Sequence, residues 1–245
     1  MTALSVQLYS VRDAVAADLP GSLARLASIG VKNVEPFDLV SDPTGLASAL
    51  ATAGLSAPSA HARLNEEPDR VFEAAAAIGV RTVIHPYTAP ERWTSEADVD
   101  AVAGELAQAA ETARSYGLQV GYHNHHWELS SSVGGRPALE LLAERLPPEV
   151  ILELDTYWAA VGGADVPALL GRLGDRVRLL HLKDGPIGMD NATQLPLGSG
   201  AMPVAAIVEA ADAAELGVLE FDDYAGDLFE GLAAGAAFAN GLGLR

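Results

Sequence analysis

The chain has 245 residues, of which 49% are hydrophobic and 20% charged, and it contains no cysteine. The lack of cysteine excludes disulfides, thiolate metal ligands and cysteine nucleophiles, and it favours a reducing, cytoplasmic location. The 33 acidic and 15 basic residues give a formal net charge of −18, which repels polyphosphate, so nucleic acid is not an expected partner. No apolar run approaches the roughly 20 residues that cross a bilayer, so no membrane span is expected either.

Short aliphatic runs alternate along the chain with Ala- and Leu-rich stretches of helical spacing, which is the pattern of repeated β–α units. Several predicted helices are followed by a glycine, a residue that favours helix termination. The predicted strands are, in chain order, Leu4–Tyr9, Val31–Pro36, Leu55–His61, Val80–His85, Leu118–His123, Val150–Asp155, Val177–His181 and Val218–Phe221. The predicted helices between them are Ser22–Ile29, Thr44–Ala53, Asp69–Ile78, Ser95–Tyr116, Pro137–Leu146, Val166–Leu173 and Val204–Ala213, with a last Ala- and Gly-rich helix after the final strand.

Eight such units in 245 residues fit a closed (β/α)8 TIM barrel, an α/β fold, better than a doubly wound sheet, which uses fewer strands per domain. No linker or shift in composition interrupts the pattern, and we therefore expect one domain over residues 1–245. Neither a P-loop nor the glycine motif of dinucleotide-binding folds occurs, so the sequence does not support nucleotide binding through those motifs.

The carboxyl ends of the predicted strands are unusually polar, and in this barrel those ends line the active-site mouth. They hold all six histidines of the chain. The full set is Gln7, Tyr9, Glu35, His61, His85, His123, Asn124, His125, His126, Glu128, Glu153, Asp155, His181, Lys183, Asp184, Glu220, Asp222 and Asp223. Imidazoles and carboxylates without thiolates suit Mn²⁺, Mg²⁺, Co²⁺ or Zn²⁺, and such an ion would relieve the repulsion among the acids. We therefore expect one divalent metal ion.

Seven short motifs together resemble a known family. They are SVQLYSVRD (Ser5–Asp13), NVE (Asn33–Glu35), YHNHHWEL (Tyr122–Leu129), ELDTYW (Glu153–Trp158), HLKD (His181–Asp184), PLGSG (Pro196–Gly200) and LEFDD (Leu219–Asp223). Across nearly the whole chain this set resembles the xylose isomerase-like TIM-barrel superfamily of sugar phosphate isomerases and epimerases. The resemblance implies the same barrel and one metal ion, with Mn²⁺ expected first.

The resemblance also implies which residues bind that ion. The family takes one ligand from each of strands five to eight, and the matching residues here are Glu128, Asp155, His181 and Glu220. Glu128 lies just past the fifth strand, where the family's glutamate lies within it, so His123 and His125 are alternative ligands. Glu153 should point to the same face of its strand as Asp155, but it lies one layer deeper in the barrel, where we expect it to support a ligand such as His181.

In the epimerases that the sequence resembles, two glutamates form an acid/base pair around the metal. Carried over, Glu128 and Glu220 would remove a proton beside a carbonyl on one face and return it on the other. This implies a sugar isomerase or epimerase acting on a ketose or another keto-sugar. If one carboxylate is displaced, one-face isomerisation or elimination becomes the expected outcome, so a dehydratase acting on an inosose or a 3-keto-glycoside is the alternative.

Further residues are expected to contact a small-molecule sugar substrate. They are His61, Lys183, Trp158, Glu35, His85, His123 and His125. Lys183 lies two residues after His181 and should point to the same side, where its ammonium can hold a hydroxyl or carboxylate. An aromatic face such as Trp158 suits the apolar side of a sugar ring, although loop packing is an equal interpretation. For His85, the alternative to substrate contact is a capping or structural role. For Glu35, the alternative is a salt bridge to Arg12 or Lys32.

Two other functions share this fold. Apurinic endonucleases use the same barrel with three metal ions, but HLKD lacks the extra histidines and the charge of −18 opposes DNA binding. A non-catalytic barrel that binds a sugar or a partner is the second. The sequence shows no dimerisation arm, and a homodimer stays an open alternative.

Overall fold

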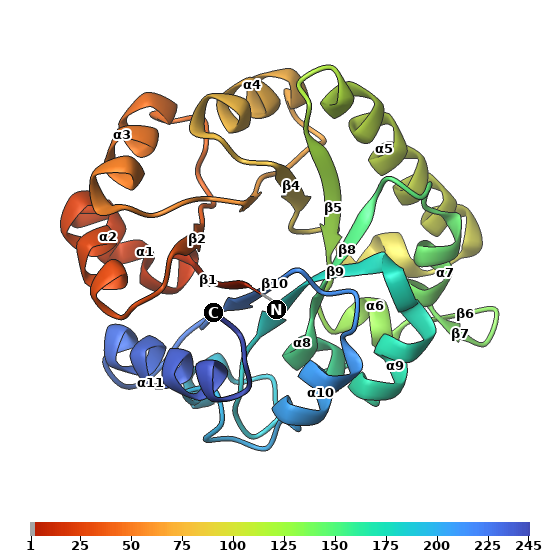
Figure 1. The fold of residues 1–245 in the computed structure, drawn as a ribbon. Coiled ribbons are helices and arrows are strands. Elements are labelled where there is room, and N and C mark those ends of the chain that lie inside the picture. The colour runs from red at the N-terminus through yellow and green to blue at the C-terminus, as the bar shows by residue number, and fades with distance from the viewer. Residues whose placement is uncertain (1–2) are drawn as a thin grey trace.

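Eight parallel strands form a near-closed barrel surrounded by helices in the computed structural model, which describes residues 3–245 (Figure 1). The strands are β1 (Ala3–Gln7), β2 (Asn33–Glu35), β3 (Ser59–His61), β4 (Thr82–His85), β5 (Gln119–His123), β8 (Ile151–Asp155), β9 (Val177–Leu182) and β10 (Leu216–Leu219). Their order is β2-β1-β10-β9-β8-β5-β4-β3. A parallel bridge between Asn33 and Ser56 joins the two ends of this sheet, so the predicted (β/α)8 TIM barrel is confirmed.

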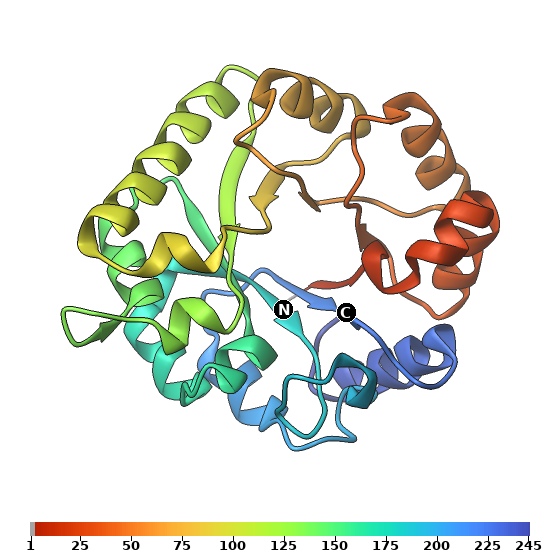
Figure 2. The ribbon, with the colours of Figure 1, turned by 180° about the vertical axis from the view of Figure 1, so that it is seen from behind.

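A ring of helices covers the outside of the barrel (Figures 1 and 2). The helices are α1 (Arg12–Ala17), α2 (Leu19–Ser28), α3 (Pro43–Ala53), α4 (Pro68–Ile78), α5 (Glu96–Arg114), α6 (Trp127–Ser130), α7 (Ala138–Arg145), α8 (Thr156–Val161), α9 (Val166–Leu173), α10 (Val204–Ala210) and α11 (Leu228–Gly241). Asp and Ser side chains cap several of them, as Asp42 does by accepting from Gly45 N at 2.8 Å. Gly54 and Gly79 end α3 and α4 in the left-handed conformation that glycine favours. Within residues 3–245, no helix is both long and apolar enough to cross a membrane.

The structure adds short elements that the sequence pattern did not predict. α1, α6 and α8 have four to six residues each, too few to show helical periodicity. A small hairpin pairs β6 (Ser132–Val133) with β7 (Arg136–Pro137), and 3₁₀ turns cover Leu8–Val11, Pro90–Trp93, Gly174–Arg176 and Asn191–Thr193. The first and last strands also end earlier than predicted, at Gln7 and Leu219. The residues after these strand ends carry the site.

The inside of the barrel changes from apolar to polar along the strands. Ile84, Ile151, Leu179, Leu216 and Val218 form a buried apolar cluster of their own, separate from the larger core between sheet and helices. Because side chains alternate across a strand, the inward positions that follow this cluster are Glu153 on β8, His181 on β9 and Glu220 just past the end of β10. A floor of aliphatic side chains therefore lies beneath a layer of acids and imidazoles.

Candidate functional site

Buried acids and imidazoles converge at the carboxyl end of the barrel. They come from β2 (Glu35), β3 (His61), β5 (His123), β8 (Glu153 and Asp155), β9 (His181), and the residues after β9 and β10 (Lys183 and Glu220). Each of these residues is at most 9% exposed. Their ligand atoms form two groups whose members lie within 4.8 Å of one another: a deep group of His61, His123, Glu153 and His181, and a rim group of Asp155, His181 and Glu220.

In the deep group, three imidazoles meet one carboxylate oxygen. Glu153 Oε2 lies 2.6 Å from His61 Nε2, 3.0 Å from His123 Nδ1 and 3.1 Å from His181 Nε2. A second acid, Glu35, completes this layer, because its Oε1 lies 2.7 Å from His181 Nε2 and 3.1 Å from His61 Nε2. The layer thus places two fully buried carboxylates against three imidazoles.

These contacts shift the pKa values of the groups in the deep layer. Burial alone would raise the pKa of Glu35, but the facing imidazoles of His61 and His181 lower it overall. In the same way, burial opposes charge on His61, yet Glu35 and Glu153 raise the pKa of its imidazole to about 9. The pKa of Glu153 falls to about 2 because of the neighbouring imidazoles, against burial and the charge of Glu35. The layer therefore favours ionised acids.

The rim group surrounds an ammonium. Lys183 Nζ lies 2.9 Å from Asp155 Oδ2, 2.7 Å from Glu220 Oε2 and 2.9 Å from Asp222 Oδ2. His181 presents its other nitrogen here, with Nδ1 at 2.7 Å from Glu220 Oε2. Burial would raise the pKa of Glu220, but Lys183 and His181 hold it well below its usual value. Burial dominates at Asp155 and raises its pKa to about 6.

Hydrogen bonds from Gln7 and Ser59, whose supporting roles the sequence motifs do not reveal, hold Glu35 in the deep layer. Gln7 Nε2 donates to Glu35 Oε1 at 2.8 Å, and the Ser59 hydroxyl donates to Glu35 Oε2. Strand alternation places Gln7 inward, and this is the signal that identifies it. Among the described contacts, Glu35 makes no ion pair with Arg12, which donates instead to the carbonyls of Tyr9 and Asp222.

Trp158 borders the rim through α8. Its backbone N–H donates to Asp155 Oδ1 at 2.8 Å, so the acid that ends β8 also caps the next helix. The Trp158 ring lies 5.8 Å from Lys183 Nζ and is 7% exposed. The structure thus brings Trp158 and Lys183 together beside Asp155 at the mouth.

Glu128 belongs to neither ligand group. It lies in α6, where Oε1 accepts from the Tyr122 hydroxyl at 2.6 Å and Oε2 accepts from His125 N at 2.9 Å. The side chain has no exposed surface, and burial raises its pKa to about 7. Tyr122 points outward from β5, because its strand neighbour His123 points into the barrel. Both Glu128 oxygens are therefore committed to hydrogen bonds that hold the β5–α6 segment.

His125 lies between the mouth and an aromatic group. Its ring stacks on Trp127 with centroids 4.3 Å apart, and it meets His123 edge to face at 5.5 Å. Its Nδ1 is buried and has no hydrogen-bond partner among the described residues. Burial lowers the pKa of His125 to about 3, so the ring is neutral at neutral pH.

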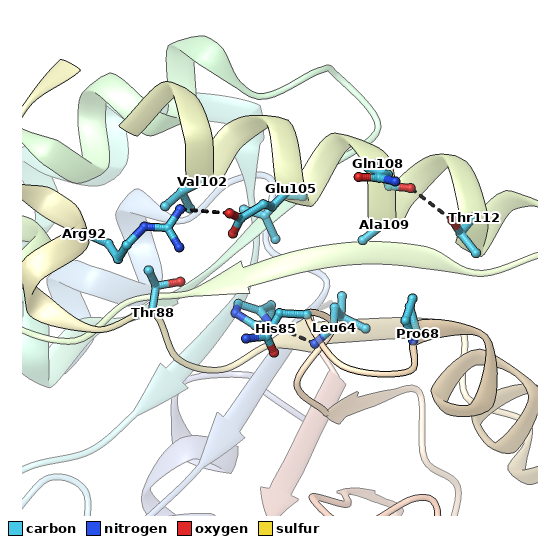
Figure 3. A pocket seen from close by; sticks show the side chains of 12 residues that line it. Leu64, Pro68, His85, Thr88, Arg92, Val102, Glu105, Gln108, Ala109 and Thr112 are labelled. Carbon is cyan, nitrogen blue, oxygen red and sulfur yellow. Dashed lines mark hydrogen bonds and ion pairs between the residues drawn. The ribbon is translucent and has the colours of Figure 1, made fainter. Parts of the chain in front are cut away.

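His85 lies outside the barrel. It lines a cavity of about 420 Å³ between β4 and α5, where its Nδ1 accepts from Leu64 N at 3.0 Å (Figure 3). Arg92 and Glu105, which form an ion pair, line the same cavity. Because Ile84 points into the barrel, the alternation of the strand sends His85 outward. The structure therefore does not bring His85 to either ligand group.

The donor set of the mouth fits a divalent ion. Only imidazole nitrogens and carboxylate oxygens are present in the two groups, which suits first-row divalent metals. One buried oxygen of these groups, Glu153 Oε1, has no hydrogen-bond partner among the described residues, whereas Asp155 Oδ2 meets Lys183 Nζ at 2.9 Å and His123 Nε2 at 3.5 Å. Buried polar atoms are normally satisfied, so Glu153 Oε1 is an oxygen that a bound ion could use.

The chain belongs to the xylose isomerase-like TIM barrel family, whose sequence model matches residues 23–234. The predicted family is thus confirmed. An inosose dehydratase from Geobacillus kaustophilus (strain HTA426) is 31% identical over 104 residues, a match that covers 40% of this chain and only 33% of that relative.

Two solved structures show the same fold. A sugar phosphate isomerase/epimerase from Parabacteroides distasonis ATCC 8503 superposes with a TM-score of 0.85 at 25% identity, covering 97% of this chain and 93% of that one. The IOLI protein, solved with a binding zinc atom, superposes with a TM-score of 0.72 at 14% identity, covering 98% of each chain. The family therefore includes proteins described as sugar isomerases, epimerases and dehydratases.

Proposed function

We propose that this protein is a metal-dependent enzyme that removes the proton beside the carbonyl of a ketose or another keto-sugar, giving isomerisation or epimerisation. The observation that carries the proposal is the buried mouth, where the carboxylates of Asp155 and Glu220 contact the ammonium of Lys183 and Glu220 also contacts His181. The name of the Parabacteroides relative supports the same reaction class.

In this proposal, Glu220 is the base. Its carboxylate is ionised and 7% exposed, so it can reach a substrate held at the mouth. Lys183 donates a hydrogen bond to the substrate oxygen that gains negative charge, and this oxygen replaces one of the three acids that the ammonium contacts in the free protein. Trp158 packs against the apolar face of the sugar, and His61 contacts its hydroxyls from β3.

A divalent ion would be held through His181 together with the carboxylates and imidazoles beside it. When bound, such an ion makes a proton beside a carbonyl more acidic by stabilising the negative charge that develops on oxygen. The resemblance adds Glu128 to the ligands, but its two oxygens accept hydrogen bonds from Tyr122 and His125. We propose His123 as the ligand from β5, because its Nε2 lies 3.5 Å from Asp155 Oδ2.

Dehydration is the second candidate, and the position of Glu128 favours it. A two-face epimerase needs a second base opposite Glu220, and the buried Glu128 is engaged elsewhere. With one base at the mouth, proton removal is followed by return to a neighbouring carbon or by loss of a hydroxyl. The partial match to an inosose dehydratase agrees with the second outcome.

The test uses solvent deuterium. The protein, loaded with Mn²⁺, is incubated in D₂O with a panel of ketoses, inososes and 3-keto-glycosides, and proton NMR follows the C–H beside each carbonyl. We expect exchange for at least one compound, and Glu220→Gln should slow it by about 10²-fold or more, since the amide cannot accept the proton. Mass spectrometry then separates isomerisation from loss of water.

The matched control is Glu209→Gln, which makes the same change at an exposed position of α10. It should exchange at the parental rate. Two results would contradict the proposal: an absence of exchange across the whole panel, or parental exchange in Glu220→Gln.

A further inference from the structure

The three acids around the ammonium of Lys183 are of two kinds. Lys183 Nζ lies 2.9 Å from Asp155 Oδ2, 2.7 Å from Glu220 Oε2 and 2.9 Å from Asp222 Oδ2. Asp155 and Glu220 are members of the rim group, whereas Asp222 belongs to neither ligand group. A divalent ion at the rim would therefore affect the three contacts of the ammonium differently.

The contacts of Lys183 with the rim group conflict with a bound ion. The carboxylates of Asp155 and Glu220 would turn from the ammonium to an ion held there, and two cations against the same oxygens repel each other. The Lys183 side chain is 1% exposed, so water cannot replace the lost partners. A buried charge without a partner is strongly unfavourable. The ammonium then needs an acid outside the rim group, and Asp222 is the only one among its described ion pairs.

Asp222 is held in place by residues other than Lys183. Gln194 Nε2 donates to Asp222 Oδ2 at 2.7 Å, and Gln194 Oε1 accepts from Asp222 N at 2.9 Å. The guanidinium of Arg12 donates to the Asp222 carbonyl at 3.2 Å. Asp222 therefore keeps hydrogen bonds to its backbone N–H, its carbonyl and its carboxylate wherever the ammonium lies.

Gln194 is buried although the loop around it is exposed. Its exposed fraction is 1%, while its neighbours Thr193 and Leu195 lie at the surface. A buried amide needs partners for both its oxygen and its nitrogen, and Asp222 supplies both. The Gln194 side chain thus ties the loop after β9 to the segment after β10, at the point where Asp222 meets Lys183.

We propose that Asp222, held by Gln194, positions Lys183 when a divalent ion occupies the rim: the ammonium leaves Asp155 and Glu220 and stays on Asp222. One N–H of the ammonium then remains on Asp222, and the others are free to donate to a substrate oxygen. Asp222 and Gln194 are positioning residues, since they act through Lys183. The role of Lys183 toward a sugar rests on the proposed function, but the position of its ammonium is measured without any sugar.

The chain suits this measurement because it has only two lysines, Lys32 and Lys183. The protein, with and without Mn²⁺, is treated with an N-hydroxysuccinimide ester of acetic acid, and peptide mass spectrometry gives the acetylation rate of Lys183 relative to that of the exposed Lys32. In the parent we expect Lys183 to be protected in both states. In Asp222→Asn, Lys183 should be protected without Mn²⁺ and acetylated at least about tenfold faster with it.

Two further variants accompany this comparison. Gln194→Leu removes both hydrogen bonds to Asp222 and should change in the same direction as Asp222→Asn. Asp223→Asn makes the matched change at the exposed neighbouring residue and should behave as the parent. Elemental analysis after dialysis counts the bound Mn²⁺, and thermal melting without metal checks that each variant folds. If Gln194→Leu does not fold, Asp222→Asn decides, because the Asp222 side chain is 21% exposed.

The proposal is overturned if Mn²⁺ increases the acetylation of Lys183 equally in the parent and in Asp222→Asn, or in neither of them. It is also overturned if the parent binds no ion, or if Asp222→Asn loses the ion, which would make Asp222 a ligand. Because no sugar is present, the expected acetylation rates without any deuterium exchange would refute only the proposed reaction.

Discussion

At the scale of single residues, Glu128 is the residue that the family resemblance assigns to catalysis but that lies buried, with both carboxylate oxygens in hydrogen bonds. The residue is enclosed in α6, and burial raises its pKa to about 7, against an ordinary value of 4.5. Between these two values the folded protein binds more protons than the unfolded chain. The contribution of Glu128 to the free energy of unfolding is therefore complete below pH 4.5 and is lost as the pH rises through about 7.

The variant Glu128→Gln tests this linkage. Gln stays neutral at every pH. The free energy of unfolding of the variant, relative to that of the parent, should therefore rise by about 3 kcal/mol between pH 4.5 and pH 8. Chemical denaturation across this range measures the difference, with Glu209→Gln as the exposed control. A difference between Glu128→Gln and the parent that is independent of pH would show that folding does not shift the pKa of Glu128.

At the scale of elements, the loop after β9 is organised by one carboxylate. Asp184 Oδ1 accepts from the backbone N–H groups of Gly185 at 2.8 Å and Met202 at 3.0 Å, and Oδ2 accepts from those of Gly198 at 2.9 Å and Gly200 at 3.0 Å. A Cβ on Gly200 would lie 2.2 Å from Asp184 Oδ1, so glycine is required there. Two motifs found in the sequence, HLKD and PLGSG, are thus two halves of one structure.

Asp184→Asn should loosen this loop. The amide loses one acceptor oxygen and turns an N–H group toward backbone donors, which we expect to lower the free energy of unfolding by about 2–4 kcal/mol. Limited proteolysis should then cut between residues 185 and 202 faster than in the parent. Asp190→Asn, an exposed change in the same loop, is the control. Equal cleavage rates in Asp184→Asn and the parent would contradict this role.

At the scale of the whole molecule, a divalent ion at the mouth would join strands from separate parts of the chain. The two ligand groups draw on β3, β5, β8, β9 and the residue after β10, so an ion bound there would stabilise the folded barrel and not the unfolded chain. At a free-ion concentration one hundred times the dissociation constant, the gain is about 2.7 kcal/mol. For a chain of this size that corresponds to a rise in Tm of about 5–11 °C.

Removal of the ion by a chelator should reverse this rise, and calorimetry measures both steps. NaCl at matched ionic strength is the control, because screening of the net charge of −18 also changes stability. In His181→Asn the increase in Tm caused by the ion should be smaller, because His181 belongs to both ligand groups. An equal rise in parent and variant would show that the stabilising ion binds elsewhere.

The eight β–α units and the polar strand ends could be predicted from the sequence. The alternation of aliphatic runs with helical stretches predicts eight β–α units, because each element must bury one face against the next layer. Strand ends are also visible in the sequence, and they located the acids and imidazoles of the mouth. Short helices such as α6 and α8 escaped prediction because four to six residues show no periodicity.

The direction of each side chain and its partners were decided by the tertiary structure. His85 and His61 both end strands, yet the first points out to a cavity against α5 and the second points into the barrel. A shift of one residue along a strand reverses the face, so an uncertain strand boundary leaves the direction open. Closure of the barrel brings His61 on β3 to Glu153 on β8, and the pairing of β8, β9 and β10 sets Lys183 among the rim acids; these residues are far apart in the chain, so their contacts could not be predicted from the sequence.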